Sequence, residues 1–245
     1  MLDKLIVGAK VIDGSAEPKE IKTVGICDGK IVVDPEDTAA KEVIDAKGKV
    51  LCPGFIDAHS HGDYLIATED GRLFKTPQGI TTELCGNCGS SYAPLEGDFK
   101  EDMIASKMFH HSAETVRKWD TFDDYMKYAE NHELSANARF YVGHGMLRRS
   151  VMGVENRPAT RKELEEMKAR LKAAMEAGAA GFSTGLIYVP GCYADTEEVV
   201  ELAKVIAPFI GIYASHIRNE SDKVVESVEE VLHIGKAAGV RTNIS

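Results

Sequence analysis

The sequence predicts an α/β fold in which a parallel sheet closes into a (β/α)8 TIM-type barrel. After Pro53, short apolar runs alternate with amphipathic helical segments, which is the pattern of parallel strands joined by crossover helices. Polar residues that could bind a metal follow several of these runs. A closed barrel brings the carboxyl ends of its strands together over one mouth, whereas an open sheet spreads them apart, so the barrel is preferred.

Length and composition fit a folded protein without a nucleic-acid or membrane partner. The 245 residues are enough for one large domain with a small appendage. Hydrophobic residues make up 44% and charged residues 28%, so we expect a packed core. The 29 Lys and Arg residues against 39 Asp and Glu residues give a net charge of -10, which argues against nucleic acid and anionic membranes.

Two features favour the cytoplasm. The N-terminus has no cationic region followed by a long apolar run, and no apolar stretch approaches membrane-spanning length. The five cysteines are an odd number in a chain of this size, which suits reduced thiols better than a disulfide framework. We therefore expect a cytoplasmic protein in which a cysteine is available as a ligand.

Residues 1–52 predict a small antiparallel β-unit that precedes the barrel at 53–245. Short apolar runs in this region are broken by turns, and no helical period is present. Asp28-Gly29 lies between two β-rich runs and is a hairpin signal. Because no polar residues converge here, we interpret this unit as structural.

The second region contains about six candidate strands, and a barrel of this kind needs eight. We therefore expect the barrel to be truncated after about strand six. The unpaired edges of its first and last strands should then invite self-association. The expected strands are 54–58, 80–85, 139–142, 181–184, 210–215 and 241–245.

Two helices between these strands have readable ends. Thr160-x-x-Glu163 is a capping box, and the helix that it opens should stop at Gly178. A helix over about 223–238 should stop at Gly239. The expected apolar faces are Leu164, Met167, Leu171 and Met175 in the first helix, and Val224, Val225, Val228, Val231 and Leu232 in the second.

The connection at 90–120 is long and irregular and contains the only tryptophan, Trp119. A loop of this kind is a candidate lid or substrate-binding insertion, and a surface excursion with a short helix is an equal alternative. We assign no ligand role to His110, His111 or His132.

His59 and His61 are the main functional signal. Residues two apart in an extended backbone point the same way, so both imidazoles should face one side at the carboxyl end of a strand. Neutral imidazole is a common zinc ligand, and two from one strand end make a bidentate grip. An isolated His-x-His would favour a polar turn, but Pro53-Gly54 before the strand and Gly62-Asp63 after it place the pair at a strand-to-loop junction.

Cysteine and histidine residues after two other strands complete the predicted cluster. Cys85 and Cys88 form a Cys-x-x-Cys, which without a second pair is a poor structural zinc site and, in a glycine-rich loop, a poor redox site. Cys88 can turn inward at the barrel mouth, whereas Cys85 fits a buried strand position. His216 ends the fifth strand and becomes a third ligand-bearing position, although alone it would be interpreted as a core histidine.

Three further residues are weaker candidates near the same mouth. His144 follows the third strand, where its flanking glycines indicate close backbone approach as much as coordination. Asp57 and Asp63 are candidates for orienting the imidazoles.

Together these motifs resemble the D-aminoacylases (N-acyl-D-amino-acid deacylases) of the amidohydrolase superfamily over essentially the whole chain. The motif Pro-Gly-Phe-Ile-Asp-x-His-x-His alone indicates only the superfamily, whereas Gly-Asn-Cys-Gly together with Gly-Leu-x-Tyr is specific to this branch. The motifs are Pro53-Gly54-Phe55-Ile56-Asp57-Ala58-His59-Ser60-His61, Gly79-Ile80-Thr81-Thr82, Gly86-Asn87-Cys88-Gly89, Gly185-Leu186-Ile187-Tyr188-Val189-Pro190-Gly191 and Ser215-His216-Ile217-Arg218.

The resemblance implies a zinc-bearing barrel with a small β-sandwich built from both chain ends. It implies that Cys88 and His216 bind a tightly held zinc, with a further histidine beyond Ser245, and that His59 and His61 form a weaker metal position. Tyr188 matches a residue that binds the substrate carboxylate. The catalytic aspartate of the family has no counterpart up to Ser245, so the catalytic residue is unknown and activity of the 245 residues alone is in doubt.

The residues by themselves indicate metal-assisted hydrolysis, in which a divalent ion polarises a carbonyl and activates water. The resemblance narrows the substrate to an N-acyl-D-amino acid, split into a carboxylate and a D-amino acid. The alternatives are a dihydroorotase- or hydantoinase-like amide hydrolase, and an inactive fragment that only binds metal or a partner. Enzymes of the first alternative usually bridge two metal ions with a carboxylated lysine after the fourth strand, and residues 181–185 contain no lysine that could form one.

Overall fold

The computed structural model describes residues 1–15, 20–64, 74–105, 113–132, 134 and 136–245. The chain divides into two compact units, Met1–Gly54 and Phe55–Ser245. Among the described residues, no helix is both long enough and apolar enough to cross a membrane.

The first unit is one mixed β-sheet. Its strand order is β3-β2-β1-β4, and β5 also pairs with β1. The predicted antiparallel arrangement holds for β1, β2 and β3 but is wrong for β4 and β5, which pair parallel with β1 because the chain crosses from the β3 edge to the far side of β1. The strands are β1 (Leu2–Val11), β2 (Ile21–Cys27), β3 (Lys30–Val33), β4 (Ala40–Asp45) and β5 (Val50–Leu51).

The predicted hairpin at Asp28-Gly29 is confirmed. Cys27 pairs with Lys30 across a two-residue loop, and Asp28 and Gly29 have φ values of 50° and 71°. Two positive φ values are the signature of a type I′ turn, whose twist matches that of the flanking strands. The Asp28 amide also donates to Asp3 Oδ2 at 2.9 Å, which fastens the turn to β1.

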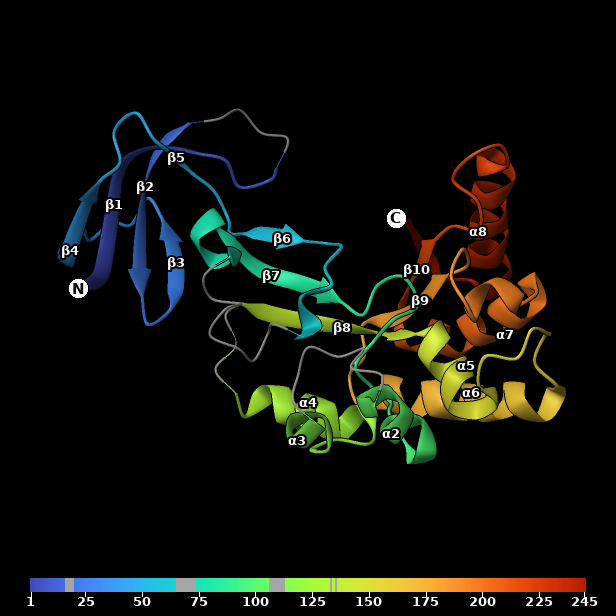
Figure 1. Ribbon diagram of the computed structural model, residues 1–245. Coiled ribbons are helices and arrows are strands. Elements are labelled where there is room, and N and C mark those ends of the chain that lie inside the picture. Colours follow the sequence, from blue (N-terminus) through green and yellow to red (C-terminus); the bar gives the residue numbers. More distant parts are fainter. Residues whose placement is uncertain (16–19, 65–73, 106–112, 133, 135) are drawn as a thin grey trace. The chain divides into compact units, whose positions relative to one another are not determined.

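The second unit is built on a six-stranded parallel sheet, and all six predicted strands are confirmed. The strands follow one another in chain order, each hydrogen-bonded to the next, as in a (β/α)8-type barrel. Figure 1 shows the strand direction turning between β6 and β10, so the sheet curls. The strands are β6 (Phe55–Asp57), β7 (Ile80–Cys85), β8 (Asn137–Gly143), β9 (Gly181–Gly185), β10 (Ile212–His216) and β11 (Arg241–Ile244).

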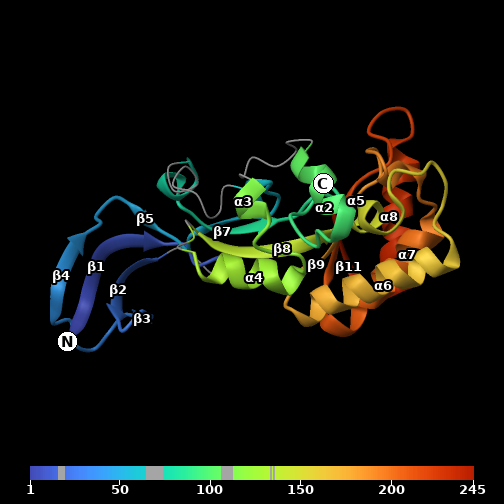
Figure 2. The same cartoon turned by 60° about the horizontal axis from the view of Figure 1, so that its bottom comes forward.

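The helices follow the strands as crossover connections, and α5 to α8 pack in succession beside the sheet (Figures 1 and 2). Their bounds are α2 (Gly97–Ala105), α3 (Ala113–Val116), α4 (Phe122–Glu130), α5 (His144–Met152), α6 (Arg161–Glu176), α7 (Thr196–Ile206) and α8 (Val224–Ala238). Short 3-10 turns are η1 (Gly62–Tyr64), η2 (Thr76–Gln78), η3 (Gly191–Tyr193) and η4 (Ala207–Phe209).

The predicted helix ends are confirmed, and one predicted face is right only in part. The Thr160–Glu163 capping box opens α6, and Gly239 ends α8 in the left-handed conformation. In α8, Val231 is buried and Val228 packs against the core as predicted, but Val225 and Leu232 are exposed. The buried stripe runs through Ser227, Val231, Ile234, Gly235 and Ala238. The smaller residues of this stripe let the helix approach β11 closely, since a Cβ on Gly235 would lie 2.2 Å from Thr242 Cγ2.

The insertion at 90–120 is anchored in the core. Trp119 is 1% exposed, and its indole donates to the Tyr92 carbonyl at 2.7 Å. Leu95 is also fully buried, so the two ends of the insertion pack as core and not as a surface excursion. His110 and His111 lie outside the described residues.

Candidate metal centre

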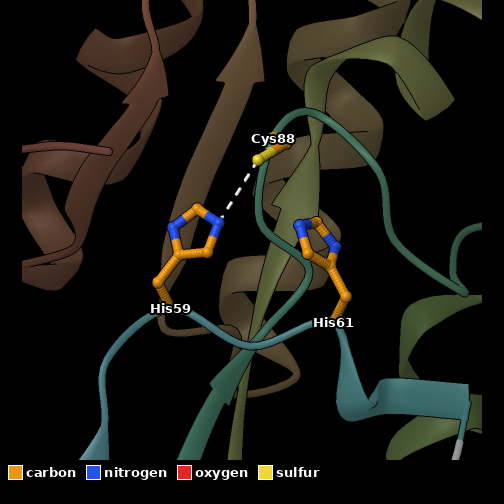
Figure 3. Close-up of side chains that lie close together, drawn as sticks. All are labelled: His59, His61 and Cys88. Atoms are coloured by element: carbon orange, nitrogen blue, oxygen red, sulfur yellow. Dashed lines mark hydrogen bonds between the residues drawn. The ribbon is translucent and has the colours of Figure 1, made fainter.

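The loop that carries His59 and His61 leaves β6 in a fixed conformation. Its backbone is held by the Ser60 amide, which donates to the Leu84 carbonyl at 3.0 Å, and by the His59 amide, which donates to Asp57 Oδ1 at 3.2 Å. Both imidazoles project from this loop toward Cys88, as Figure 3 shows. The predicted same-side presentation of the two rings is therefore what the fold produces, with ring centroids 5.4 Å apart.

Cys88 reaches the histidines because the loop after β7 is strained and tightly packed. Cys88 itself has φ 55°, a left-handed conformation that is uncommon for a residue with a side chain and typical of functional sites. The preceding Gly86 also has positive φ, and a Cβ there would lie 2.4 Å from the Tyr141 carbonyl oxygen. Asn87 is fully buried and donates to the carbonyls of Leu84 and Ser60, so it ties this loop to the histidine loop.

The predicted ligand atoms converge on the Cys88 sulfur. Cys88 Sγ lies 3.4 Å from His59 Nε2 and 3.5 Å from His216 Nδ1. The ligand atoms of His59, His61 and Cys88 all lie within 4.8 Å of one another. A tetrahedral zinc ion, with Zn–S about 2.3 Å and Zn–N about 2.0–2.1 Å, holds sulfur and nitrogen ligands about 3.5 Å apart. The spacing and the chemistry of this set therefore fit zinc.

The electrostatics of the cluster favour neutral ligands. Burial, and then the neighbouring His216, lower the pKa of His59; burial, and then His59, lower the pKa of His61. Both imidazoles therefore keep a lone pair for coordination near neutral pH. Burial, and then Glu220, raise the pKa of the Cys88 thiol, so its proton has to be displaced when a cation binds.

The other sequence candidates lie outside the cluster. Cys85 is fully buried, as predicted, and burial raises the pKa of its thiol. His144 is also fully buried, and its Nε2 lies 2.9 Å from Glu198 Oε1. Within the described part of the chain, neither Asp57 nor Asp63 forms a hydrogen bond or ion pair with an imidazole ring. Asp57 accepts from the His59 amide, and burial raises the pKa of Asp63 to about 7.

A hydrogen-bonded cluster around Lys75, next to the histidine loop, was not predicted from the sequence. Lys75 Nζ donates to Asp57 Oδ2 at 2.6 Å, to Ser60 Oγ at 2.7 Å and to Glu83 Oε2 at 2.7 Å. Ser60 in turn donates to Glu83 at 2.6 Å and accepts from the Gly62 amide. All three ammonium protons are used, so Lys75 joins β6, the histidine loop and β7. No spacing in the sequence indicates this, because Lys75 precedes η2 and carries no motif.

Tyr188 lies against the cluster, as expected. Its hydroxyl is 3.5 Å from each ring nitrogen of His216, and the two rings have centroids 4.8 Å apart. The side chain lines a cavity of about 320 Å³ together with His61 and Cys88. Arg149 lines the same cavity and was not singled out from the sequence. A larger cavity, of about 810 Å³, lies over α2 and α5, but it contains none of the predicted ligands.

Two proteins of known activity are similar to this chain in sequence. The chain is 36% identical over 245 residues to a D-aminoacylase of Alcaligenes xylosoxydans xylosoxydans, covering 99% of this chain and 50% of the relative. It is 38% identical over 251 residues to an N-acyl-D-glutamate deacylase of the same organism, covering 100% and 49%. The chain thus spans about half the length of these relatives.

The chain is also similar to a solved structure of a deacylase. The chain is similar to an N-acyl-D-glutamate deacylase from Bordetella bronchiseptica complexed with zinc and a phosphonate inhibitor, with a TM-score of 0.88 and 37% identity, covering 98% of this chain and 50% of that one. The sequence profile of the Amidohydrolase family matches residues 42–211, which is more than half of the chain. This match, over the strands that carry His59, His61, Cys88 and Tyr188, places the chain in the amidohydrolase family.

Proposed function

We propose that this chain supplies the zinc-binding part of a hydrolase that cleaves the amide bond of N-acyl-D-amino acids, releasing a carboxylate and a D-amino acid. The observation that carries the proposal is the convergence of His59 Nε2 and His216 Nδ1 on the Cys88 sulfur at 3.4 and 3.5 Å. The similarity to a D-aminoacylase and to a zinc-complexed N-acyl-D-glutamate deacylase supports both the metal and the substrate class.

Cys88 and His216 would hold a tightly bound zinc ion, and His59 and His61 would form a second, weaker metal position beside it. A bound zinc ion would polarise the amide carbonyl and lower the pKa of water to about 7, which makes hydroxide available at neutral pH. The histidine loop and the Cys88 loop hold His59 Nε2 3.4 Å from the Cys88 sulfur, and Cys88 would give up its thiol proton when a metal ion binds. The hydroxyl of Tyr188, on the cavity wall beside Cys88, donates a hydrogen bond to the substrate carboxylate.

The end of β9 favours this proposal over a hydantoinase-like site. That alternative would place a carboxylated lysine there, but the strand reads Gly181-Phe182-Ser183-Thr184-Gly185. Ser183 Oγ instead accepts from the Gly89 amide at 3.1 Å and donates to the Gly86 carbonyl. Ser183 on β9 therefore holds the loop that carries Cys88 through two hydrogen bonds to its backbone.

The test uses the purified protein at its full natural length. Its zinc content is measured by metal analysis, and its hydrolysis of N-acetyl-D-methionine is compared with that of the L isomer. Cys88→Ser should lose most of the zinc and the D-specific hydrolysis, whereas the control Cys52→Ser, at an exposed cysteine, should retain both. Full zinc content in Cys88→Ser would refute the metal assignment, and a zinc-loaded protein without hydrolysis of either isomer would refute the reaction.

Two further proposals concern the setting of the protein. We propose a cytoplasmic location, which is supported by five cysteines without disulfide partners, and cell fractionation tests it. We also propose that the edges of β6 and β11, each paired on one side only among the described strands, can bind further strands, including those of a second copy. Light scattering of the purified chain over a range of concentrations tests this association.

A further inference from the structure

Two adjacent arginines on α5 have opposite environments. Arg148 is fully buried, and its Nη1 donates to both carboxylate oxygens of Glu198 at 2.6 Å. Arg149 is half-buried and faces the cavity beside Cys88. Within the described ranges, no carboxylate forms an ion pair with Arg149, so this cation reaches the cavity without a counter-charge of its own.

One hydrogen bond fixes the position of the Arg149 side chain. Its Nη2 donates to the Val189 carbonyl at 3.0 Å, next to Tyr188 on the loop after β9. The guanidinium is therefore tied to the segment that carries the proposed carboxylate-binding tyrosine. It also contributes to the wall of the larger cavity over α2 and α5, so it stands where the two cavities meet.

A guanidinium in this position is suited to binding an anion. It has five N–H donors in a planar fork, and a single bond to a carbonyl leaves most of them available. Partial burial also lowers the pKa of Arg149, which reflects the cost of removing its charge from water. A carboxylate that bound two of the free donors would offset this cost and form the strongest type of neutralising pair.

We propose that Arg149 binds a second carboxylate of the substrate, distinct from the one assigned to Tyr188. The inference rests on the proposed function and deepens it, because it makes dicarboxylic N-acyl-D-amino acids the preferred substrates. The second carboxylate can belong to an acidic side chain or to an acidic acyl group. Both present the same chemistry to the guanidinium, and the choice of substrates separates them.

The kinetic test compares three substrates in the full-length, zinc-loaded protein. N-acetyl-D-glutamate carries the second carboxylate on its side chain, N-succinyl-D-methionine carries it on the acyl group, and N-acetyl-D-methionine lacks it. In Arg149→Gln, kcat/KM should fall roughly 10- to 100-fold for the first or the second substrate, as expected for a lost charged hydrogen bond, and less than about 3-fold for N-acetyl-D-methionine. Arg149→Lys should recover part of the loss because it restores the charge.

A matched control is Arg170→Gln, since Arg170 lines only the larger cavity and already pairs with Glu96 and Glu166. It should leave the ranking of the three substrates unchanged. An equal loss for all three substrates in Arg149→Gln would show that Arg149 binds the carboxylate common to them, and would overturn the proposal. Unchanged kinetics with all three would show that Arg149 only holds the Val189 loop, which also overturns it.

A binding measurement separates this proposal from the proposed reaction. Calorimetry on the zinc-free protein should give tighter binding of at least one of the two dicarboxylates than of N-acetyl-D-methionine, and Arg149→Gln should abolish the preference. If the zinc-loaded protein hydrolyses none of the three compounds while this preference persists, the reaction is refuted and the anion site stands. If hydrolysis occurs without any preference, the reaction stands and the anion site is refuted.

Discussion

Replacement of Glu198 by glutamine should destabilise the second unit by about 3 kcal/mol. Glu198 is 3% exposed, and each of its carboxylate oxygens accepts two hydrogen bonds. Oε1 accepts from Arg148 and from His144 Nε2, and Oε2 accepts from Arg148 and from the Ala159 amide. Whichever oxygen becomes the amide nitrogen, two of these four hydrogen bonds are lost, and the fully buried Arg148 loses its counter-charge.

Two independent arguments give the same magnitude. Breaking a buried ion pair by removing one partner costs about 3–5 kcal/mol. Burial alone would raise the pKa of Glu198, but the hydrogen bonds and charges of His144 and Arg148 outweigh it and lower the pKa from 4.5 to about 2. At 1.36 kcal/mol for each pH unit, a fall of this size corresponds to about 3 kcal/mol of stability at neutral pH.

The same pKa fixes the sign of the pH dependence. Because the folded-state pKa is depressed, the contribution of Glu198 is fully present above pH 4.5 and is lost as the pH falls toward 2. The glutamine variant has no such group. The difference in stability between the two proteins should therefore shrink on acidification, to about 1 kcal/mol at pH 3.

The assay is urea unfolding followed by circular dichroism at pH 7 and at lower pH, with the denaturant slope checked for equality in the two proteins. Glu201→Gln on the same helix is the control, because Glu201 pairs with Lys168 and Lys204 near the surface and should change stability by less than about 1 kcal/mol. A loss below 1 kcal/mol in Glu198→Gln at pH 7, or a difference that grows on acidification, would refute the reasoning.

Three changes at the candidate site have separate outcomes. Tyr188→Phe should raise KM for N-acetyl-D-methionine more than it weakens zinc binding, and equal kinetics would remove the hydroxyl from the site. Lys75→Met leaves Asp57 without its cation, so zinc affinity should fall roughly 10-fold in a chelator competition; unchanged affinity would make Lys75 purely structural. In Gly185→Ala the new Cβ would lie 2.2 Å from the Cys88 carbonyl oxygen, so zinc content should fall, and full occupancy would contradict this packing.

Local patterns in the sequence predicted the elements well because local forces determine them. The β6 to β11 strands are short apolar runs bounded by turns, and their parallel pairing follows from the helices between them. The start of α6 at a capping box and the end of α8 at Gly239 are set by hydrogen bonds and backbone conformation of the residues themselves. These features need no knowledge of distant neighbours.

The errors arose where distant contacts decide. The α8 helix offers two apolar stripes, and packing against Thr242 on β11 selects the one with the smaller residues over the one with Val225 and Leu232. In the first unit, β4 is a parallel partner of β1, which the turn pattern could not indicate because the paired residues, such as Leu2 and Ala40, lie far apart in the chain. The spacing of apolar residues in the sequence is compatible with either choice, so it cannot decide between them.

In the candidate site too, some residues could be predicted from local patterns, and others are brought together only by distant contacts. His59, His61 and Cys88 could be singled out because they lie in the loops that follow strands, and the carboxyl ends of neighbouring parallel strands must meet. The same rule brings in His216, which ends β10 and lies 128 residues from Cys88. The Lys75 cluster could not be predicted, since its three acceptors come from separate segments. The roles of the four ligands and of Tyr188 stay predictions until zinc and substrate binding are measured.

Arg148 and Arg149 show why residue type alone is not enough. Both are arginines in one helix turn, and neither was singled out from the sequence. A helix advances by about 100° for each residue, so neighbours must face different surroundings. Arg148 turns toward Glu198, which belongs to α7 and lies fifty residues away, and is neutralised there. Arg149 turns toward the cavity and the loop after β9, where no described carboxylate pairs with it. The charge of Arg149 is therefore available to a ligand. Only the packing of α5 against α7 and the loop after β9 determines which arginine is neutralised and which faces the cavity.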